Sequence, residues 1–318
     1  MNTQHKYLLK DFNNGSRRAL ARIISLVEND GEIEGDIRDK LYQRTGHAYR
    51  IGMTGPPGAG KSTLVNQMTK MYRAQGKTVG IIAVDPTSPF TGGALLGDRV
   101  RMDDHTLDKG VFIRSMATRG SLGGLSAKAQ EAADVLDAFG KDIVIYETVG
   151  VGQSELDIVE AADTTVVVLV PESGDSVQAM KAGLMEIADI FVMNKADREG
   201  ADRALRELSA ILHLRPAHDW NPPVLKAVAI RNEGIEKILG QVEMHRSHLD
   251  EHELLAKKRK ERFIKTVHAL VSLRLKQDFW DEKAREILSR HIAGLDQNKT
   301  SPYRAAKQLL EHYRGSLV

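Results

Sequence analysis

The run GPPGAGKST, at residues 55–63, constrains the fold of this chain more than any other feature. It fits the pattern G-x-x-x-x-G-K-[ST], it follows an apolar segment of strand type, and a segment of helix type begins directly after it. In this context the backbone N–H groups of the loop and the N-terminus of the helix bind phosphate. We therefore predict that a nucleotide is bound by Gly55, Pro56, Pro57, Gly58, Ala59, Gly60, Lys61, Ser62 and Thr63.

Short apolar segments alternate with helical segments from residue 48 to about residue 240. The pattern predicts an α/β fold, a P-loop NTPase with a mostly parallel sheet covered by helices. Expected strands lie at 48–53, 78–84, 111–114, 142–147, 164–170, 188–193 and 223–229.

Helical patterns flank this region at both ends of the chain. Residues 16–45 are predicted to be helical, with an apolar face packed on the main domain. Residues 241–290 are expected to form one continuous helix, and a last helix is expected at 301–314. The predicted organisation is therefore an N-terminal helical extension at 1–46, a nucleotide-binding domain at 47–240 and a C-terminal helical region at 241–318.

Composition excludes several classes of protein. The formal net charge of +2 is too small to indicate nucleic-acid binding, and the basic run at 257–262 is expected to be a solvated helix face. The 318 residues contain no cysteine, which excludes disulfides and thiolate metal sites and suits a cytoplasmic location. No apolar stretch approaches the ~20 residues that span a membrane, so neither nucleic acid nor membrane is an expected partner.

The sequence Asn194-Lys195-Ala-Asp197 follows a predicted strand and is typical of the loop that recognises guanine. The Asp197 carboxylate can accept hydrogen bonds from both N1–H and N2–H₂ of guanine, and adenine offers no such pair of donors. Hydrogen bonds to a charged group contribute roughly 1.5–3 kcal/mol each, so GTP is preferred to ATP. A third base contact is predicted at the end of the last predicted strand, where GTPases have Ser-Ala-x and this chain has Val228, Ala229 and Ile230.

Magnesium is the expected cofactor of GTP or GDP. Lys61 is placed to contact the β- and γ-phosphates, and the Ser62 hydroxyl to bind Mg²⁺. Asp85, Asp98 and Glu147 lie in segments expected at the carboxyl ends of strands, where ligands bind in open α/β sheets. Since Mg²⁺ takes only one or two carboxylates, the acids that bind it directly stay open.

The segment IYETVGVGQSE, at 145–155, predicts slow hydrolysis. The acid before Gly150 is Glu147, and the residue after Gly150 is Val151, where Ras-like proteins have a glutamine that orients water. Val151 has no polar group for that role. Gln153 is a candidate catalytic residue beside Lys61 and Glu147, with a structural role in the same segment as the alternative.

Together these strings resemble the MeaB/ArgK family of P-loop GTPases, the G-protein chaperones of adenosylcobalamin-dependent methylmalonyl-CoA mutase. The resemblance covers most of the chain and is carried by GPPGAGKST, VDPTSPFTGGALLGD, MATRGSLGGL, ETVGVGQSE, VPESGDSVQAMKAGLMEIADI and NKAD. It implies helical extensions at both ends and a homodimer formed by the C-terminal one. It places Ser62, Asp98 and Glu147 by the metal, with Asp85 nearby.

The resemblance also implies switch segments at 85–101 and 147–157, and a third at 171–181 that contacts an acyl-CoA mutase. Asp175 and Lys181 in the third segment are the predicted partner contacts. The expected function is to gate loading of the mutase with cofactor and to protect the mutase, which accelerates GTP hydrolysis in return. The departures from the family pattern are Val228 in place of the usual small polar residue, Tyr146 and Phe90.

Two alternatives stay open. A nickel metallochaperone would need clustered ligands, and His245, His248 and His252 recur at helical spacing, although a solvated helix is the favoured interpretation. A kinase of a transport protein would prefer ATP, which the loop at 194–197 argues against. The apolar stripe formed by Phe263, Ile264, Val267, Leu270 and Val271 is expected to be shared between the core and a second subunit.

Overall fold

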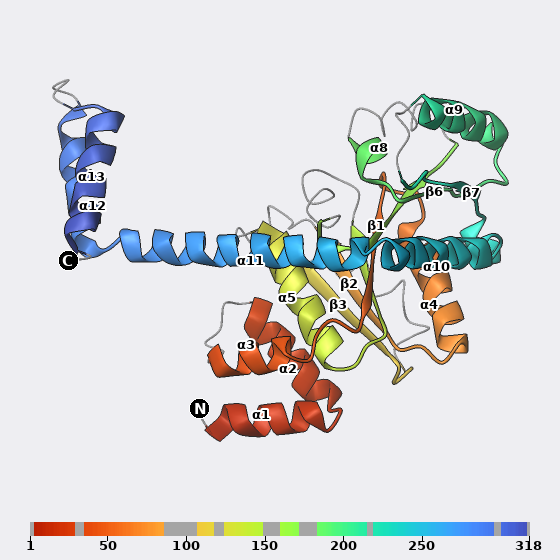
Figure 1. Cartoon of the computed structure of the whole chain (residues 1–318), viewed down its shortest axis with the longest axis horizontal. Coiled ribbons are helices and arrows are strands. Elements are labelled where there is room, and N and C mark those ends of the chain that lie inside the picture. The colour runs from red at the N-terminus through yellow and green to blue at the C-terminus, as the bar shows by residue number, and fades with distance from the viewer. Residues whose placement is uncertain are drawn as a thin grey trace. The chain divides into compact units, whose positions relative to one another are not determined.

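The computed structural model describes residues 3–28, 35–85, 107–117, 124–148, 160–171, 183–214, 219–295 and 300–316 (Figure 1). Its strands are β1 Tyr49–Thr54, β2 Val79–Asp85, β3 Val111–Ala117, β4 Ile143–Thr148, β5 Thr164–Leu169, β6 Ile190–Met193 and β7 Val224–Lys226. The helices that precede β7 are α1 Thr3–Asn13, α2 Arg17–Glu28, α3 Gly35–Tyr42, α4 Lys61–Ala74, α5 Gly124–Ala138, α8 Leu184–Ile187 and α9 Ala201–His213. The remaining helices are the 3-10 turn η2 Ala229–Arg231, α10 Ile235–Glu251, α11 Leu254–Phe279, α12 Glu282–Ala293 and α13 Pro302–Ser316.

The strands form one sheet in the order β3-β2-β4-β1-β5-β6-β7, and every pair in it is parallel. The α/β prediction and the existence of all seven predicted strands are thereby confirmed. The central strand β1 lies between β4 and β5, so the chain leaves β1 where the strand order reverses. Ligands of such sheets bind outside the carboxyl ends of the strands at this point.

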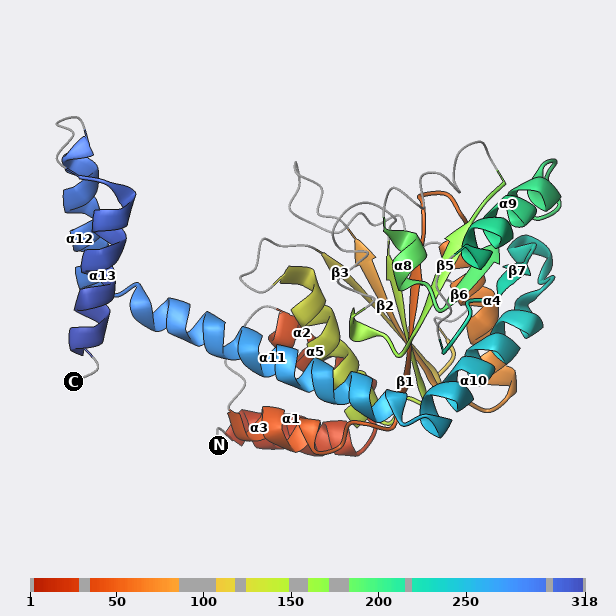
Figure 2. The ribbon, with the colours of Figure 1, turned by 45° about the horizontal axis from the view of Figure 1, so that its top comes forward.

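Helices cover both faces of the sheet (Figure 2). Alternation along the strands separates the two layers: Val166 and Val168 of β5 face α4 and α10, whereas Val167 and Leu169 face α8 and α9. Helices α2 and α5 continue the second layer over β2, β3 and β4. Strands buried on both faces in this way have near-continuous apolar sequences, which is why the sequence pattern located them.

The N-terminal helices pack onto the layer formed by α5. The predicted apolar face of the 16–45 region is confirmed, since the apolar residues of α2 are buried in that layer. Helix α1 was not predicted. Its Phe12 side chain is 2% exposed and makes an edge-on contact with Phe139, with ring centroids 5.1 Å apart, so tertiary packing holds α1 where the sequence pattern is weak.

The predicted continuous helix at 241–290 is wrong, because two breaks divide it. The first break lies between α10 and α11, where Glu253 has a φ of 57°, a left-handed conformation that ends a helix. The second lies before α12, where the Asp281 carboxylate accepts a hydrogen bond from the Ala284 N–H at 2.6 Å and so caps the new helix.

The chain divides into two compact units, residues 1–262 and 263–318. The boundary expected at residue 240 falls inside the first unit, and the three-part organisation stays a prediction. Within the second unit, the His312 Nε2 lies 3.1 Å from the Asp281 carboxylate, and the rings of Phe279 and Tyr313 are in contact. In the part of the chain that the structure describes, no helix is long and apolar enough to cross a membrane.

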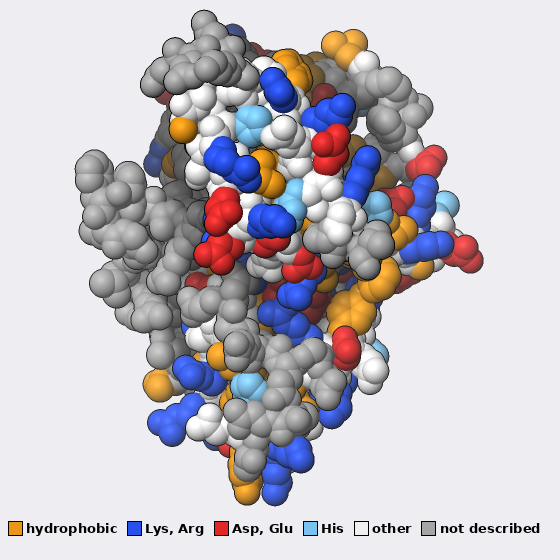
Figure 3. Space-filling model, turned by 90° about the vertical axis from the view of Figure 1, so that its left-hand side faces the viewer, with side chains coloured by type: hydrophobic (Ala, Val, Ile, Leu, Met, Phe, Trp, Pro, Cys, Tyr) orange, Lys and Arg blue, Asp and Glu red, His pale blue; other side chains and the backbone are white. Residues whose placement is uncertain are grey.

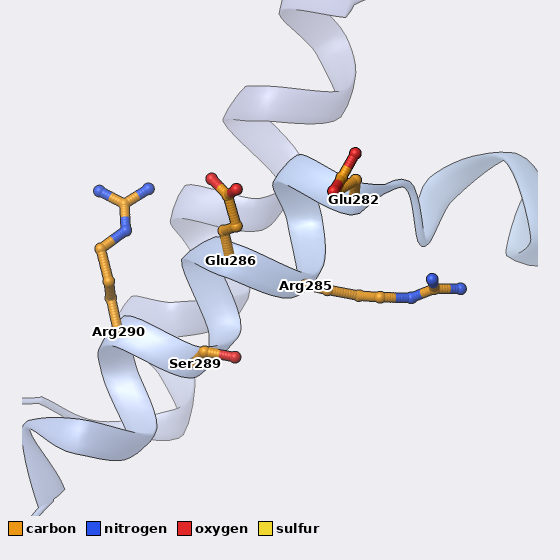
Figure 4. Close-up of a pocket in the computed structure, with 5 residues that line it drawn as sticks. All are labelled: Glu282, Arg285, Glu286, Ser289 and Arg290. Atoms are coloured by element: carbon orange, nitrogen blue, oxygen red, sulfur yellow. The ribbon is translucent and has the colours of Figure 1, made fainter.

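Charges of both signs are interspersed on the face of the molecule shown in Figure 3. A shallow depression on α12 has the same character, and in Figure 4 its two arginines point in different directions rather than converging. It is lined by residues of one helix: Glu282, Arg285, Glu286, Ser289 and Arg290. We therefore place no candidate site there.

Candidate functional site

The predicted phosphate-binding run connects β1 to α4 at the carboxyl edge of the sheet (Figure 2). Its path depends on two glycines. Gly55 has a φ of 133°, and a Cβ there would lie 2.0 Å from the Val168 carbonyl oxygen. Gly60 has a φ of 88°, and its Cβ would lie 2.3 Å from the Asn194 side-chain nitrogen. Larger residues are excluded at both positions, so the loop can pass close to β5 and to the 194–197 loop.

Lys61 is the first residue of α4, and its side chain folds back over the loop. The ammonium donates to the Gly55 carbonyl at 2.6 Å and to the Pro56 carbonyl at 2.9 Å, and Lys61 is only 5% exposed. Phosphate oxygens of a nucleotide are stronger acceptors than these neutral carbonyls, because a hydrogen bond between two charged groups is roughly twice as strong as a neutral one.

Ser62 and Glu147 meet across two elements of this edge. Glu147 lies on β4 beside Met53 of β1, is 7% exposed, and accepts a hydrogen bond from the Ser62 hydroxyl. A hydroxyl and a carboxylate in contact are a pair of hard oxygen ligands of the kind that Mg²⁺ takes. The residues present therefore fit the predicted cofactor.

The other predicted metal and switch residues are only partly described. Asp85 is the last residue of β2, and its backbone pairs with Ala117 at the same edge of the sheet as Glu147. Four predicted residues lie outside the described residues: Asp98, Gln153, Asp175 and Lys181.

Asn194 ties three loops of the site together. Its side-chain N–H donates to the Ala59 carbonyl at 2.8 Å, and its side-chain oxygen accepts from the Ala229 N–H at 3.1 Å. The backbone N–H of Asn194 also donates to Leu169, at the end of β5. Asn194 is 2% exposed, and a single buried amide thus fixes the phosphate loop relative to the predicted base-binding loop.

The next residues of that loop have an unusual backbone. Lys195 has a φ of 56°, in the left-handed region, which turns the chain so that the Ala196 N–H donates to the Ala227 carbonyl at 3.0 Å. The Asp197 side chain is 29% exposed, and its Oδ2 lies 3.2 Å from the Arg231 guanidinium. The arrangement leaves an accessible carboxylate on a fixed backbone.

Residues 228–230 begin a 3-10 turn and do not extend the last strand, which ends at Lys226. The N–H groups of Val228 and Ala229 already donate within the protein, to Glu233 and Asn194. Ile230 is 76% exposed. We therefore expect a backbone contact between this turn and a base to come from Ile230.

Of the histidines considered as metal ligands, His245 and His248 pack against Trp220, and His252 packs against His248. His245 is 1% exposed, its Nδ1 lies 2.8 Å from the Thr164 hydroxyl, and the rings of His245 and His248 lie 4.8 and 5.2 Å from that of Trp220. Burial lowers the pKa of His245 to about 4, although Asp189 at 3.4 Å opposes the shift. Within the described ranges, no group of three His, Cys, Asp or Glu residues could hold a metal ion.

The expectation that the basic run 257–262 is a solvated face is wrong for part of the run. Arg259 and Arg262 pair with Asp163 at 3.2 and 3.0 Å, and the Asp163 side chain is fully buried. Lys258 donates to the Asp163 carbonyl at 3.1 Å. Sequence spacing gave no signal for this cluster, because the acid and its partners are almost a hundred residues apart in the chain.

Comparisons with known proteins show the family of this chain. A family model described as methylmalonyl-CoA mutase-associated GTPase MeaB matches residues 20–284. A protein of Pyrococcus abyssi whose name assigns it to the GTPases is 50% identical over 312 residues, spanning 97% of this chain and 96% of the relative. The GTPase ArgK of Escherichia coli is 38% identical over 233 residues, which cover 70% of each protein.

Two further matches bear on fold and function. The methylmalonic aciduria type A homolog of Mus musculus, described as mitochondrial, is 37% identical over 243 residues, covering 70% of this chain and 59% of the mouse protein. A crystal structure of LAO/AO transport system kinase is similar with a TM-score of 0.73 and 26% identity, covering 99% of both chains. The second match confirms the P-loop NTPase fold over the whole length.

Proposed function

The chain belongs to the family of methylmalonyl-CoA mutase-associated GTPases (MeaB), and we propose that it is a GTP-hydrolysing chaperone of an adenosylcobalamin-dependent acyl-CoA mutase. In this role it gates loading of the mutase with cofactor and protects the loaded mutase. The family membership supports GTPase activity in general. The chaperone role and the identity of the partner are the proposal.

The observation that carries the nucleotide assignment is the position of Asn194. Its amide joins Ala59 of the phosphate loop to Ala229 of the last turn, and Asp197 follows it on a backbone turned by Lys195. A phosphate cradle and an accessible carboxylate are thereby held on one rigid support. Such a support fits a guanine nucleotide, because Asp197 can accept two hydrogen bonds from guanine and none of that kind from adenine.

The chain's own residues divide the work of binding and hydrolysis. The loop N–H groups hold the phosphates, and the Lys61 ammonium exchanges the carbonyls of Gly55 and Pro56 for phosphate oxygens. Ser62 and Glu147 would hold Mg²⁺, with Asp85 and Asp98 as the further acids of the proposal. Bound Mg²⁺ would neutralise charge on the β- and γ-phosphates.

Slow hydrolysis in the free protein is the second part of the proposal. Val151 has no group to orient water, and Gln153 is the candidate that remains. The proposed partner completes the site through the segments at 85–101, 147–157 and 171–181, with Asp175 and Lys181 as contacts. The mouse relative supports this partner, since its name refers to methylmalonic aciduria.

We also propose a homodimer formed by the C-terminal region. The members of the predicted apolar stripe on α11 are between 38% and 52% exposed, which is high for large apolar side chains at helical spacing. Light scattering of a Val267→Asp variant tests this proposal, and a dimer that persists would contradict it. A cytoplasmic location stays a prediction.

The decisive experiment is a GTPase assay with and without a purified adenosylcobalamin-dependent acyl-CoA mutase. The free protein is expected to turn over slowly, since a P-loop GTPase with an incomplete site can run at ~10⁻⁴ s⁻¹ and gains 10³–10⁵-fold on completion. Parallel binding assays with GTP and ATP separate a GTPase from a kinase. A free rate above roughly 1 s⁻¹ that ignores the mutase would contradict the chaperone role.

A further inference from the structure

We propose that Arg231 is a positioning residue for guanine recognition, which it serves by holding the Asp197 carboxylate in the orientation that binds the base. The inference rests on the proposed function, because it concerns the same nucleotide site. Its starting point is a contact at that site: the Arg231 Nη2 lies 3.2 Å from the Asp197 Oδ2.

Asp197 needs such a partner because of its surroundings. Its side chain is 29% exposed, and an accessible carboxylate rotates between several orientations unless a donor fixes it. The turn before Arg231 begins with Val228, which is 5% exposed and has no side-chain donor. Arg231 stands at the end of the same turn and places its guanidinium within ion-pair distance of the carboxylate.

The turn that carries Arg231 is itself held firmly. Val228 and Glu233 exchange backbone hydrogen bonds at 3.0 and 3.2 Å, and the Arg231 N–H donates to the Val228 carbonyl at 2.9 Å. Asn232 closes the turn with a φ of 59°. Since the Ala229 N–H is bound to the Asn194 amide, the turn and the 194–197 loop form one unit, and the guanidinium starts from a fixed base.

The arginine and a guanine can share the carboxylate. An ionised carboxylate has about four lone-pair sites, and guanine would occupy two of them through N1–H and N2–H₂. The guanidinium contact recorded here involves one oxygen, Oδ2. A guanidinium beside one oxygen leaves acceptors for both base contacts and restricts the rotation that would otherwise misalign them.

The strength of the ion pair is not the source of the effect. Arg231 is 57% exposed, and an exposed pair of this kind contributes little to stability. The gain comes instead from pre-organisation, since a side chain already in its bound orientation loses less freedom when the ligand arrives. The change should therefore appear in base discrimination and not in the free energy of unfolding.

The test compares dissociation constants of GDP, inosine diphosphate and ADP for the full-length protein and three variants. Inosine keeps N1–H and lacks the 2-amino group, so it reports one of the two base contacts. Arg231→Ala should weaken GDP binding roughly three- to tenfold and inosine diphosphate binding less, which narrows the ratio between them. Arg231→Lys, which keeps a charged donor, should restore most of the loss.

Arg203→Ala is the matched control, because Arg203 is an exposed arginine in an ion pair with Glu207, on α9. It should leave all three dissociation constants unchanged. Equal weakening of GDP, inosine diphosphate and ADP by Arg231→Ala would mean a merely structural role and would overturn the inference. Tighter GDP binding would also overturn it, because the arginine would then compete with the base.

The two proposals fail in different ways. A wild-type protein that binds ADP as well as GDP would refute the guanine-nucleotide assignment and the inference with it. A wild-type protein that prefers GDP, with an Arg231→Ala variant that keeps the same ratios, would refute the inference alone.

Discussion

The two edges of the sheet use charged residues in opposite ways. At the carboxyl edge, Lys61 is buried against neutral carbonyls and Asp197 is accessible. At the other edge, where the strands begin, Asp163 is buried and meets Arg259, Arg262 and the backbone N–H of Arg50.

The energetic difference between the edges follows from their partners. Burial disfavours the charged form of Asp163, but Arg262, Arg259 and Arg50 outweigh it and hold its pKa below the ordinary value. Nearby, the Asp137 carboxylate accepts backbone N–H groups of residues 46–48. These charges are paired inside the protein, whereas in the proposed function Lys61 and Asp197 also contact a nucleotide. Burial of a charge therefore does not mark a functional site unless its partners are also considered.

The largest expected effect on stability is at the edge of the sheet where the strands begin. Asp163→Asn leaves Arg259 and Arg262 without their buried counter-charge, and breaking such a cluster costs roughly 3–5 kcal/mol of unfolding free energy. Urea denaturation measures the loss. Asp202→Asn, which removes an exposed partner of Lys226, is the control and should leave the transition unchanged. If both variants unfold at the same urea concentration, Asp163 does not stabilise the fold in this way.

Lys61→Ala is expected to weaken nucleotide binding more than it lowers stability. Loss of the ammonium removes charge-assisted contacts to phosphate, each of which contributes roughly 1.5–3 kcal/mol, so GTP affinity should fall at least about a hundredfold. The free energy of unfolding should change less than in Asp163→Asn, because the Gly55 and Pro56 carbonyls that accept from Lys61 belong to the same loop. Calorimetry measures GTP affinity, and urea denaturation of the same preparation measures the free energy of unfolding. A destabilised variant that still binds GTP would contradict the assignment.

The accessible carboxylate should determine which base is bound. Asp197→Asn replaces two acceptors with one acceptor and one donor, which matches xanthine better than guanine. GTP affinity should fall by about 1.5–3 kcal/mol, and XTP affinity should rise. ATP is the control ligand, and its affinity should not change. Competition binding with the three nucleotides provides the measurement. If the order of affinities stays as in the wild type, Asp197 does not contact the base.

The smallest expected effect is a pH dependence of the unfolding free energy, from a histidine near the edge where the strands begin. The pKa of buried His245 is about 4, below the ordinary 6.5, with Asp189, Lys258, His248 and Asp163 as the surrounding charged groups. The folded state therefore binds this proton less readily than the unfolded state, and the stabilisation present above pH 6.5 is lost as the pH falls toward 4.

Between pH 7.5 and 5.5 the loss from this group should be about 1 kcal/mol. His245→Gln should reduce the pH dependence of the unfolding free energy. His268→Gln, at an exposed histidine of α11, is the matched control and should retain it. Identical pH profiles for the wild type and His245→Gln would show that the buried histidine does not titrate in this way.

What could be predicted from the sequence follows the same division. The carboxyl edge is built from contiguous runs, so residues 55–63 and 194–197 stood out in the sequence as the two loops that Asn194 joins in the structure. The other edge is built from pairs distant in the chain, such as Asp163 and Arg262. Local sequence spacing does not indicate such pairs. The same limit explains why helix α1 and the break at Glu253 were missed. Both depend on packing and backbone conformation rather than on periodicity.

The cluster around Asp163 has a consequence for the order of synthesis. The ribosome delivers Asp163 and strand β5 well before Arg259 and Arg262, which arrive almost a hundred residues later. Until then the carboxylate has to stay hydrated or protonated, since burying it unpaired is costly. The nascent sheet therefore cannot close stably around β5 while α11 is still missing. A chain stalled before residue 259 would keep the start of β5 exposed, and that interval is when a chaperone or a protease of the cell would meet it.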